Sequence, residues 1–334
     1  MTKIYIVRHG EAEGNVFRRI HGQFDGLLTP MGMRQVEFVK RRFETVPIDA
    51  CYSSDLTRAC LTARGVFEPK GLKLRRRTAF REIDLGVWED LPFGYIYRYD
   101  GERMGLFNHD PVHWSVEGGE VFDQFTQRFI DGMKEAAEEN DGGSIALFCH
   151  SAVLRSVLYR LFFWGELEKV PYCDNTAVSC LTYDKGSFTY DYLSDNSHVP
   201  PELSTFHRQA KWRTGGMKKI NLYYEPWTGA EKLPEELAVP EAGKTMLAML
   251  DGEIVGSVTV DEPDGEVGHI LDMGICRVWQ GFDMSDQLLG CAVSHFRHLG
   301  CTRVSGSGLP ENLTHRYGFR DGMFAISPKQ YRWD

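Results

Sequence analysis

Two histidines stand directly after apolar runs that are typical of buried strands. Residues 3–7 form a short run rich in β-branched residues, and Arg8 and His9 follow it. Residues 144–149 form a second apolar run, which ends at His150. Open α/β sheets keep their ligand crevice at the carboxyl ends of such strands. One histidine there would be weak evidence, but two could serve as a nucleophile and a phosphate ligand.

Other polar residues could reach the same crevice. Residues 53–55 can cap a helix that carries Arg58 near its start, and the N-terminus of this helix offers free N–H groups to an anion. Residues 80–90 form an acid-rich loop that contains Glu82. We expect the crevice to receive six side chains: Arg8, His9, Asn15, Arg58, Glu82 and His150.

These residue types suit phosphoryl chemistry. Two guanidiniums can neutralise a phosphomonoester dianion in bidentate fashion. A neutral imidazole can attack phosphorus and hold the phosphoryl group covalently. A carboxyl group can protonate the departing alkoxide and then act as a base toward water. We assign no metal site, since His109 and His113 have helical spacing but no third ligand beside them.

The elements that must position these groups alternate between strands and helices. Thr29-Pro30 predicts the start of a helix that runs to about residue 43. We expect further strands at 48–52 and 72–74, helices at 120–139 and 152–164, and a hairpin of 176–183 with 188–193. Such alternation predicts an α/β fold, an open sheet with helices on both faces. Residues 91–117 read as an irregular aromatic insertion, either a lid over the substrate or a segment packed on the body.

Several motifs in this order resemble the histidine phosphatase (phosphoglycerate mutase-like) superfamily over about residues 1–195. They are Arg8-His9-Gly10-Glu11 with Asn15, residues 53–59 with Thr62-Ala63, residues 81–86, residues 118–120, and Cys149-His150-Ser151 with Val153 and Arg155. The resemblance implies a phosphoglycerate mutase-like sheet.

The resemblance also implies a role for each site residue. His9 would be the phosphohistidine nucleophile and Glu82 the general acid and base. Arg8, Arg58 and His150 would bind the transferring phosphoryl group. Asn15, Gln23 and Ser151 would complete the substrate-binding and phosphate-binding set.

The chain departs from the family pattern at positions that would reshape the substrate pocket but remove no catalytic group. Asp90 replaces the usual glycine after the Trp-Glu pair, and Ser151-Ala152 replaces a glycine pair. The Glu-Arg-His-Tyr-Gly segment of the mutases is absent, and residues 81–86 look like the phosphatase branch. We therefore expect a metal-independent phosphatase that hydrolyses a small phosphomonoester. The alternatives are a mutase-type phosphotransferase and a bifunctional phosphatase and acetyltransferase, while an intact residue set argues against a non-catalytic module.

A second domain is expected after the first. We predict a first domain at 1–197, a linker at 198–216 with a short helix around 203–212, and a second domain at 217–334. The second domain is expected to be α+β, with strands at 219–224, 244–250, 253–260, 268–276 and 303–306 and a helix at 284–299 that Gly300 closes. Its order resembles the acetyl-CoA-binding acetyltransferase fold, the GNAT superfamily, over about 219–326. The matching residues are 272–275, Trp279-Gln280-Gly281, Gly300-Cys301 and 317–319.

The chain departs from the acetyltransferase pattern at the positions that would bind acetyl-CoA and supply the acid. At 280–285 the later glycines that would cradle the CoA pyrophosphate are missing, and Asp283 puts a negative charge there. Asp286 adds to the repulsion, and Thr314 stands where a tyrosine would serve as the acid. We expect a degenerate acetyltransferase fold that does not bind acetyl-CoA.

The composition and net charge of the chain exclude some classes of binding partner. The 334 residues are 42% hydrophobic and 25% charged, which is typical of globular chains, and the net charge of −9 argues against nucleic-acid and membrane-surface binding. Eight scattered cysteines without a Cys-x-x-Cys pair favour reduced thiols in the cytoplasm. We expect a small phosphorylated metabolite as the partner and no cofactor. A homodimer through the second domain is left open.

Overall fold

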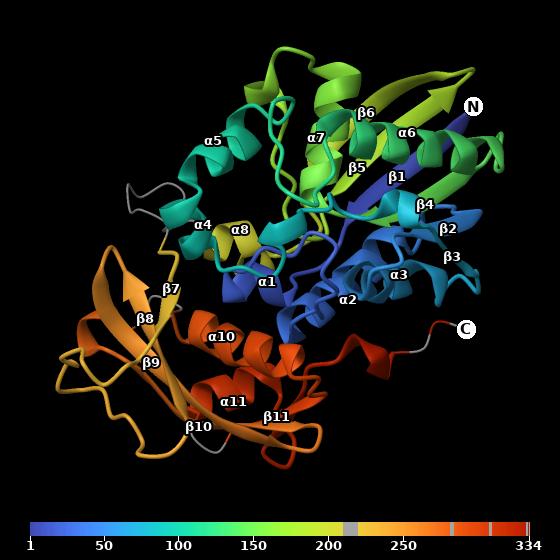
Figure 1. Ribbon diagram of the computed structural model, residues 1–334. Helices are drawn as coiled ribbons and strands as arrows, with labels where there is room; N and C mark the ends of the chain where they lie inside the picture. Colours follow the sequence, from blue (N-terminus) through green and yellow to red (C-terminus); the bar gives the residue numbers. More distant parts are fainter. Residues whose placement is uncertain (210–219, 281–283, 307–308, 332, 334) are drawn as a thin grey trace. The chain divides into compact units, whose positions relative to one another are not determined.

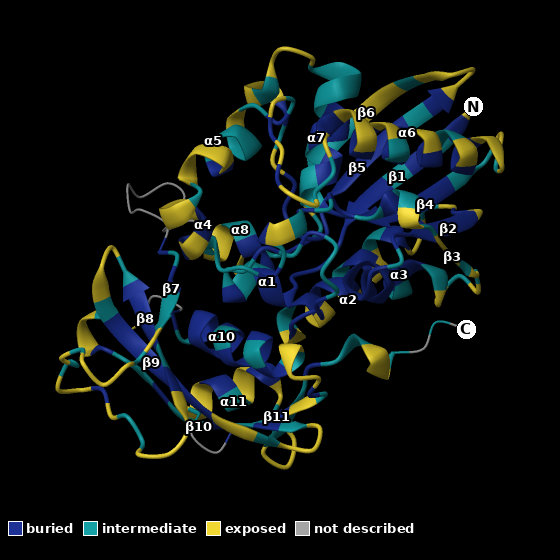
Figure 2. Cartoon of the chain, in the orientation of Figure 1, coloured by how far each residue is buried: buried dark blue, intermediate teal, exposed yellow. Residues whose placement is uncertain are grey.

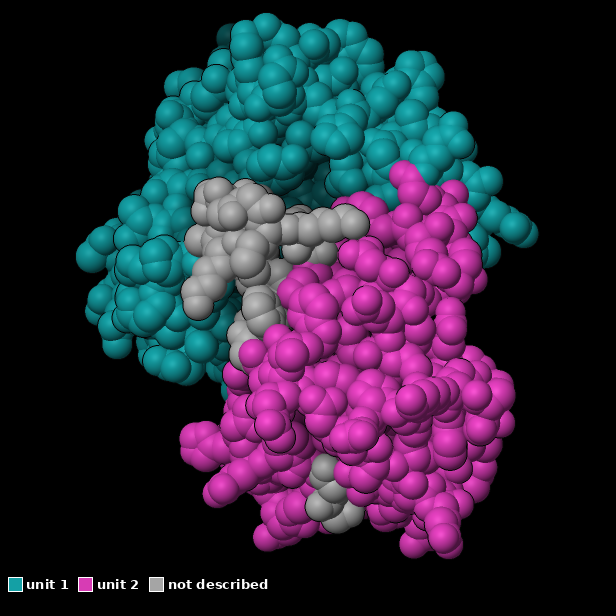
Figure 3. All heavy atoms as spheres, turned by 90° about the vertical axis from the view of Figure 1, so that its left-hand side faces the viewer, with its two compact units in different colours: residues 1–12, 22–89, 102–215 teal, residues 13–21, 90–101, 216–334 magenta. Residues whose placement is uncertain are grey.

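The chain folds into two compact units whose segments interleave along the sequence. The computed structural model describes residues 1–209, 220–280, 284–306, 309–331 and 333 (Figure 1). The first unit comprises residues 1–12, 22–89 and 102–215, and the second comprises 13–21, 90–101 and 216–334 (Figure 3). Two short segments from the N-terminal half thus belong to the unit built mainly from the C-terminal part.

The first unit is built on a six-stranded sheet with the order β3-β2-β4-β1-β5-β6. Its strands are β1 (Thr2–Arg8), β2 (Ala50–Ser53), β3 (Leu74–Arg76), β4 (Ser144–Cys149), β5 (Val178–Asp184) and β6 (Ser187–Asp195). The pairs among β3, β2, β4 and β1 are parallel, while β5 pairs antiparallel with β1 and with β6. The predicted strands and hairpin are therefore confirmed, with shifts of one to two residues at most ends.

The register between β1 and β4 decides where the two histidines lie. In this parallel pair Arg8 stands opposite Cys149, one residue before His9 and His150 respectively. The backbone N–H of His9 donates to the carbonyl oxygen of Cys149 at 2.9 Å. Both histidines consequently leave the sheet side by side at the same edge.

Helices cover both faces of this sheet. The main ones are α2 (Pro30–Phe43), α3 (Thr57–Phe67), α6 (Phe122–Glu138) and α7 (Ser151–Phe162). Val7 and Phe148 on one face share a core with α2 and α3. On the other face Tyr52 contacts Phe80, which packs edge-on against Phe129 of α6. Successive strand residues point to opposite faces of the sheet, and the helices on each face bury the side chains that point toward them. Figure 2 shows the central strands in the buried colour.

The expectation that residues 91–117 are irregular is wrong. They contain α4 (Phe93–Tyr99) and α5 (Gly101–His109). Their aromatic residues have modest helix propensity, and packing stabilises α4 instead: Ile96 is buried, and Gly94 lies against the backbone of residues 221–222. At the other end of the segment, Trp114 is buried against Trp88 and Phe107, as the packed-segment interpretation expects.

The second unit has its own six-stranded sheet, with the order β12-β11-β10-β9-β8-β7. Its strands are β7 (Tyr223–Pro226), β8 (Lys244–Leu250), β9 (Glu253–Asp264), β10 (Val267–Ile275), β11 (Arg303–Ser305) and β12 (Met323–Ala325). Only β10 and β11 pair in parallel. The long helix α10 (Met284–His298) ends before Gly300, whose φ of 82° is left-handed, as the sequence predicts. The sequence did not predict α11 (Glu311–Tyr317) or β12.

Short elements complete the chain. They are α1 (Glu13–Phe17), α8 (Thr205–Arg208) and the 3-10 helices η1 (Thr78–Phe80), η2 (Gly86–Trp88), η3 (Leu167–Lys169), η4 (Pro201–Leu203), η5 (Arg277–Trp279) and η6 (Pro328–Gln330). The predicted linker begins with η4 and α8, and its residues 210–216 lie outside the described residues. Of the described helices, none has the length and apolarity required to cross a bilayer. The eight cysteines, all within the described part, form no disulfide.

Gly32 near the start of α2 permits a close backbone approach. A Cβ atom at this position would overlap the carbonyl oxygen of Glu11, in the loop that follows the β1 histidine. We predict that Gly32→Ala lowers the free energy of unfolding by about 1–3 kcal/mol, because the added atom must displace backbone. Urea denaturation gives this value.

Gly105→Ala is the matched control for this substitution. Gly105 lies inside α5, and a Cβ there would meet open space. Alanine should raise stability at this position by about 0.5–1 kcal/mol through helix propensity. If both substitutions changed the free energy of unfolding by the same amount, the close backbone approach at Gly32 would not contribute to stability.

Candidate functional site

His9 is held in one ring orientation by its own loop. Its Nδ1 lies 2.7 Å from the carbonyl oxygen of Gly10. A carbonyl oxygen only accepts, so Nδ1 carries the hydrogen, and the lone pair of the neutral ring is on Nε2. Asn175 donates from Nδ2 to the His9 carbonyl at 3.0 Å, and the Gly10 N–H donates to the Thr62 hydroxyl at 2.9 Å. A buried imidazole with a defined tautomer results.

His150 lies beside His9. The two ring centroids are 5.2 Å apart, with an angle of 56° between the ring planes. His150 is fully buried and His9 is 4% exposed. The sheet register thus brings together the two histidines that the sequence predicts at one crevice.

Arg8 and Arg58 supply buried positive charge near the histidines. Arg8 donates from Nη1 to the Cys173 carbonyl at 2.6 Å. Arg58 donates from Nη1 and Nη2 to the carbonyls of Phe24 and Gly22 at 2.8 and 2.6 Å. Burial lowers the pKa of Arg58, and the charges of Asp25, Glu82, Glu89 and Arg8 act on it as well. Because a guanidinium has five N–H donors, each arginine keeps donors for an anion.

Glu82 lies at the start of α7, the helix that follows His150. Its Oε1 accepts from the N–H groups of Ile83 at 3.0 Å and Val153 at 2.7 Å, and its Oε2 accepts from Ala152 at 3.0 Å. The first N–H groups of a helix lack partners within the helix, and a carboxylate satisfies them well. Glu82 is therefore fixed beside His150 and is 8% exposed.

The predicted anion site at the N-terminus of α3 is filled by the protein itself. Asp25 accepts from the Thr57 N–H at 2.7 Å and from the Thr57 hydroxyl at 2.8 Å. The residue at the cap position is Leu56, and residues 53–55 do not cap the helix as expected. Instead, Arg81 binds Asp55 in bidentate fashion at 2.7 and 2.6 Å. The N-terminus of α3 differs from the prediction because Asp25, which is distant in sequence, reaches it.

The three remaining predicted site residues differ in their surroundings. Gln23 donates from Nε2 to the Glu82 carbonyl at 3.3 Å and accepts from Arg81 at 3.1 Å, so it lies at the Glu82 loop. Ser151 is the first residue of α7 and is half-buried. Asn15 lies in α1, a segment of the second unit.

The described residues contain no group of three or more His, Cys, Asp or Glu side chains that could hold a metal ion. His113, one of the helically spaced histidines, instead lies 2.8 Å from an Asp110 oxygen.

Comparison with known proteins assigns the family. A sequence profile described as the Histidine phosphatase superfamily (branch 1) matches residues 4–196, more than half of the chain. The chain belongs to this superfamily. It is 40% identical over 215 residues to a "Probable phosphoglycerate mutase GpmB" of Yersinia pestis (strain Pestoides F), a match that covers 62% of this chain and 100% of the relative.

Other similarities agree with that assignment. A "Metal-independent phosphoserine phosphatase" of Arabidopsis thaliana is 28% identical over 206 residues, which cover 60% of this chain and 84% of the relative. The solved structure of Bacillus stearothermophilus YhfR is similar with a TM-score of 0.57 and 28% identity, and it covers 60% of this chain and 100% of that one. The predicted α/β class with a phosphoglycerate mutase-like sheet is thereby confirmed.

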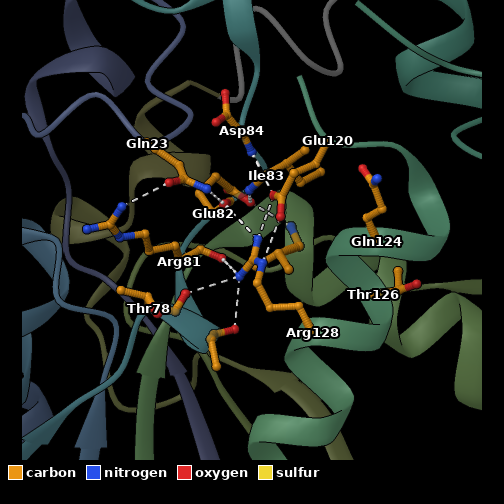
Figure 4. Close-up of polar contacts among 12 residues, drawn as sticks. Gln23, Thr78, Arg81, Glu82, Ile83, Asp84, Glu120, Gln124, Thr126 and Arg128 are labelled. Carbon is orange, nitrogen blue, oxygen red and sulfur yellow. Dashed lines mark hydrogen bonds and ion pairs between the residues drawn. The ribbon is translucent and has the colours of Figure 1, made fainter. Parts of the chain in front are cut away.

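Sequence reasoning missed Arg128, which holds the Glu82 loop of this superfamily member in place (Figure 4). From α6 its guanidinium binds Glu120 through Nε at 2.8 Å and Nη2 at 2.6 Å. The same group donates to a row of backbone carbonyls, those of Thr78, Ala79, Arg81 and Glu82, at 2.9 to 3.3 Å. Position 128 falls within the helix predicted at 120–139, and nothing in the local pattern distinguishes it from a solvated arginine.

A second missed feature is the turn of residues 173–177, which anchors the His9 loop. The Asp174 carboxylate accepts from the Ser204 hydroxyl at 2.6 Å and from Asn196 at 2.8 Å. The Thr176 N–H donates to the Arg8 carbonyl at 3.2 Å, and Thr176 has a left-handed φ of 64°. Polar residues before a predicted hairpin look like an ordinary loop, so only the tertiary contacts reveal this role.

Arg128→Gln tests the support of Glu82. The shorter side chain should release residues 78–82, and displacement of a catalytic group by about 1 Å can cost about 10²-fold in rate. We expect kcat with p-nitrophenyl phosphate to fall by about that factor, with little change in the far-ultraviolet circular dichroism.

Arg77→Gln is the matched control. Arg77 is next to the same loop, but its side chain binds Glu135 and Glu139 at the surface. Surface pairs of this kind contribute little, so its kcat should stay near that of the parent. An equal loss in both variants would contradict a specific role for Arg128.

Proposed function

We propose that the first unit is a metal-independent phosphatase that hydrolyses a small phosphomonoester through a phosphohistidine at His9. The observation that carries this proposal is the pair of adjacent buried histidines, one of which has its Nδ1 bound to the Gly10 carbonyl, so that the lone pair of its neutral ring is on Nε2. Membership of the histidine phosphatase superfamily supports it.

In the first half of the proposed cycle, the phosphoryl group moves to the enzyme. Nε2 of His9 attacks phosphorus, and the bond from phosphorus to the ester oxygen breaks. The Glu82 carboxyl gives its proton to the departing alkoxide, so that an alcohol leaves. N–H donors of Arg8, Arg58 and His150 stabilise the negative charge on the three equatorial oxygens of the phosphoryl group. This stabilisation matters most in the transition state.

In the second half, water replaces the alcohol. The Glu82 carboxylate takes a proton from water while the water oxygen attacks phosphorus. The bond between phosphorus and His9 Nε2 breaks, and inorganic phosphate leaves. Burial of both histidines and of Glu82 limits the access of bulk water to the phosphohistidine.

Hydrolysis is favoured over mutase chemistry by the sequence around the acid. A mutase must return the phosphoryl group to its substrate before water arrives, and the mutase segment Glu-Arg-His-Tyr-Gly is absent next to Glu82. The similarity to a probable phosphoglycerate mutase keeps that activity as the second candidate. To distinguish hydrolysis from mutase activity, the rate of interconversion of 2- and 3-phosphoglycerate, primed with 2,3-bisphosphoglycerate, is compared with the rate of phosphate release.

His9→Ala tests the nucleophile. We expect the parent to hydrolyse p-nitrophenyl phosphate in EDTA and the variant to lose at least about 10³-fold in kcat, since the covalent route is gone. His113→Ala, at an exposed position, should keep full activity. Full activity of the His9 variant, or complete loss in EDTA, would refute the proposal.

We further propose that the domain predicted at 217–334 has a degenerate GNAT-like fold that does not bind acetyl-CoA. Residues 281–283 of the expected pyrophosphate cradle lie outside the described residues. Asp286, in the first turn of α10, is buried; its carboxylate accepts from the Tyr317 hydroxyl at 2.8 Å and lies 2.5 Å from Arg316. Its charge is therefore partly compensated by Arg316.

Isothermal titration of the full chain with acetyl-CoA tests this second proposal. We expect no binding up to millimolar ligand, since two acidic residues precede or begin α10 where the two phosphates would lie. A micromolar dissociation constant would refute it and would favour the bifunctional alternative. Titration with CoA alone separates pyrophosphate recognition from recognition of the acetyl group.

A further inference from the structure

We propose that residues 203–208 act as a strap that positions the loop of His9 for attack on phosphorus. This inference rests on the proposed phosphatase function. The strap comprises the end of η4 and the helix α8, and it follows residues 4–196, which match the family profile. It contacts two segments that hold His9: the loop of residues 8–11, here called the His9 loop, and the turn of residues 173–177. All of these residues belong to the first unit.

The strap binds a buried carboxylate in the His9 loop. The Glu11 side chain is 2% exposed. Its Oε2 accepts from the Thr205 hydroxyl at 3.1 Å and from Nη2 of Arg208, while its Oε1 accepts from the Thr29 hydroxyl at 2.9 Å. Among these described side-chain partners, Arg208 alone supplies a positive charge. A buried carboxylate that loses its cation is strongly destabilised, so the ion pair favours one placement of the loop.

Gln35 of α2 extends this connection to the backbone. Its Oε1 accepts from the Glu11 N–H at 2.7 Å, and its Nε2 donates to the Leu203 carbonyl at 2.7 Å. The Gln35 side chain is fully buried. Because a buried amide that loses a partner is costly, movement of the strap away from the His9 loop would be opposed at both ends of this side chain.

The strap also binds the turn of residues 173–177. The Asp174 carboxylate, which is buried, accepts from the Ser204 hydroxyl at 2.6 Å and from the Phe206 N–H at 3.2 Å. The Ser204 oxygen accepts in turn from the His207 N–H at 3.0 Å and thereby caps α8. The start of the strap is thus fixed by a carboxylate of the turn.

The turn holds the backbone of the His9 loop. Asn175 donates from Nδ2 to the His9 carbonyl at 3.0 Å, and the Thr176 N–H donates to the Arg8 carbonyl at 3.2 Å. The Cys173 carbonyl accepts from the Arg8 side chain at 2.6 Å. The strap therefore binds both supports of His9, one on each side of it in the fold.

Two other groups of the proposed site are anchored elsewhere. Arg58 is bound by the carbonyls of residues 22 and 24, and Glu82 by N–H groups at the start of α7. Loosening of the strap should therefore displace His9 and leave Arg58 and Glu82 in place. Attack on phosphorus should suffer more than the binding of a phosphate group, which makes Arg208 a positioning residue.

The test uses Arg208→Gln in the full chain, with p-nitrophenyl phosphate as substrate and with orthovanadate and inorganic phosphate as inhibitors. Vanadate takes a fifth ligand from an attacking nitrogen and so resembles the transition state, whereas phosphate resembles the bound product. We expect kcat to fall about 10- to 100-fold and the inhibition constant of vanadate to rise by about the same factor, while that of phosphate stays within about twofold.

The two inhibitors separate positioning from general damage. Partial unfolding lowers kcat through the fraction of active protein, but it leaves both inhibition constants of the remaining enzyme unchanged. An unchanged vanadate constant, or a parallel rise in both constants, would therefore overturn the proposal.

Further variants test the ion pair itself. Arg208→Lys keeps the positive charge and a donor for Glu11, so its kcat should stay within about threefold of the parent. Glu11→Gln combined with Arg208→Gln should be no worse than Arg208→Gln alone, since both act through one pair. A larger loss in the double variant, or no recovery with lysine, would contradict positioning through this pair.

Arg160→Gln is the matched control. The Arg160 side chain is 29% exposed, close to the 34% of Arg208, and it also binds a carboxylate within the first unit, that of Asp123. None of its described contacts is with the His9 loop or the strap. Both inhibition constants should keep their parent values in this variant, and a raised vanadate constant would contradict a specific role for the strap.

Hydrogen exchange measures the same positioning without catalysis. In Arg208→Gln, amides of residues 9–11 and 174–177 should exchange at least about tenfold faster, while those of β2 stay as protected as in the parent. Unchanged exchange in both segments would overturn the proposal whether or not the parent is active. An inactive parent whose variant shows faster exchange there would instead refute the phosphatase function alone.

Discussion

The parallel register of β1 and β4 is the constraint on which the site depends. It pairs Arg8 with Cys149, so both strands end at the same level and both histidines leave the sheet together. A shift of one residue would turn the apolar side chains of the slipped strand to the opposite face and separate the rings. Because both faces of these strands are covered by helices and buried, such a shift is costly, and the geometry of the site follows from hydrophobic burial.

Around this pair, the protein uses carboxylates to satisfy the starts of helices. Asp25 fills the N-terminus of α3, and Glu82 fills that of α7. Both helix ends would otherwise be ready anion sites. In the proposed mechanism, the anionic substrate is therefore left with the guanidiniums and His150 as its main ligands, and the fixed Glu82 is the proton donor.

Buried charge in this protein is paired across long sequence distances. Glu11 accepts from the hydroxyls of Thr29 and Thr205 and binds Arg208, which ties α8 to the loop after His9. Glu13, two residues later, belongs to the second unit and is bound by Arg297 of that same unit. The loop after His9 is thus divided between the two units within a few residues, and each unit supplies the partner for its own carboxylate. Burial of a charge is tolerated only with such partners.

Much of the fold was determined by the sequence alone. Apolar runs followed by histidine predicted β1 and β4, Thr29-Pro30 predicted the start of α2, and Gly300 predicted the end of α10, because each signal lies within a few neighbouring residues. Tertiary structure alone decided that Asp25 would fill the α3 terminus, that Arg128 would hold the Glu82 loop, and that residues 13–21 and 90–101 would join the second unit. These outcomes depend on pairs of residues far apart in the chain, and local propensity and spacing contain no information about which distant side chain satisfies a given buried group.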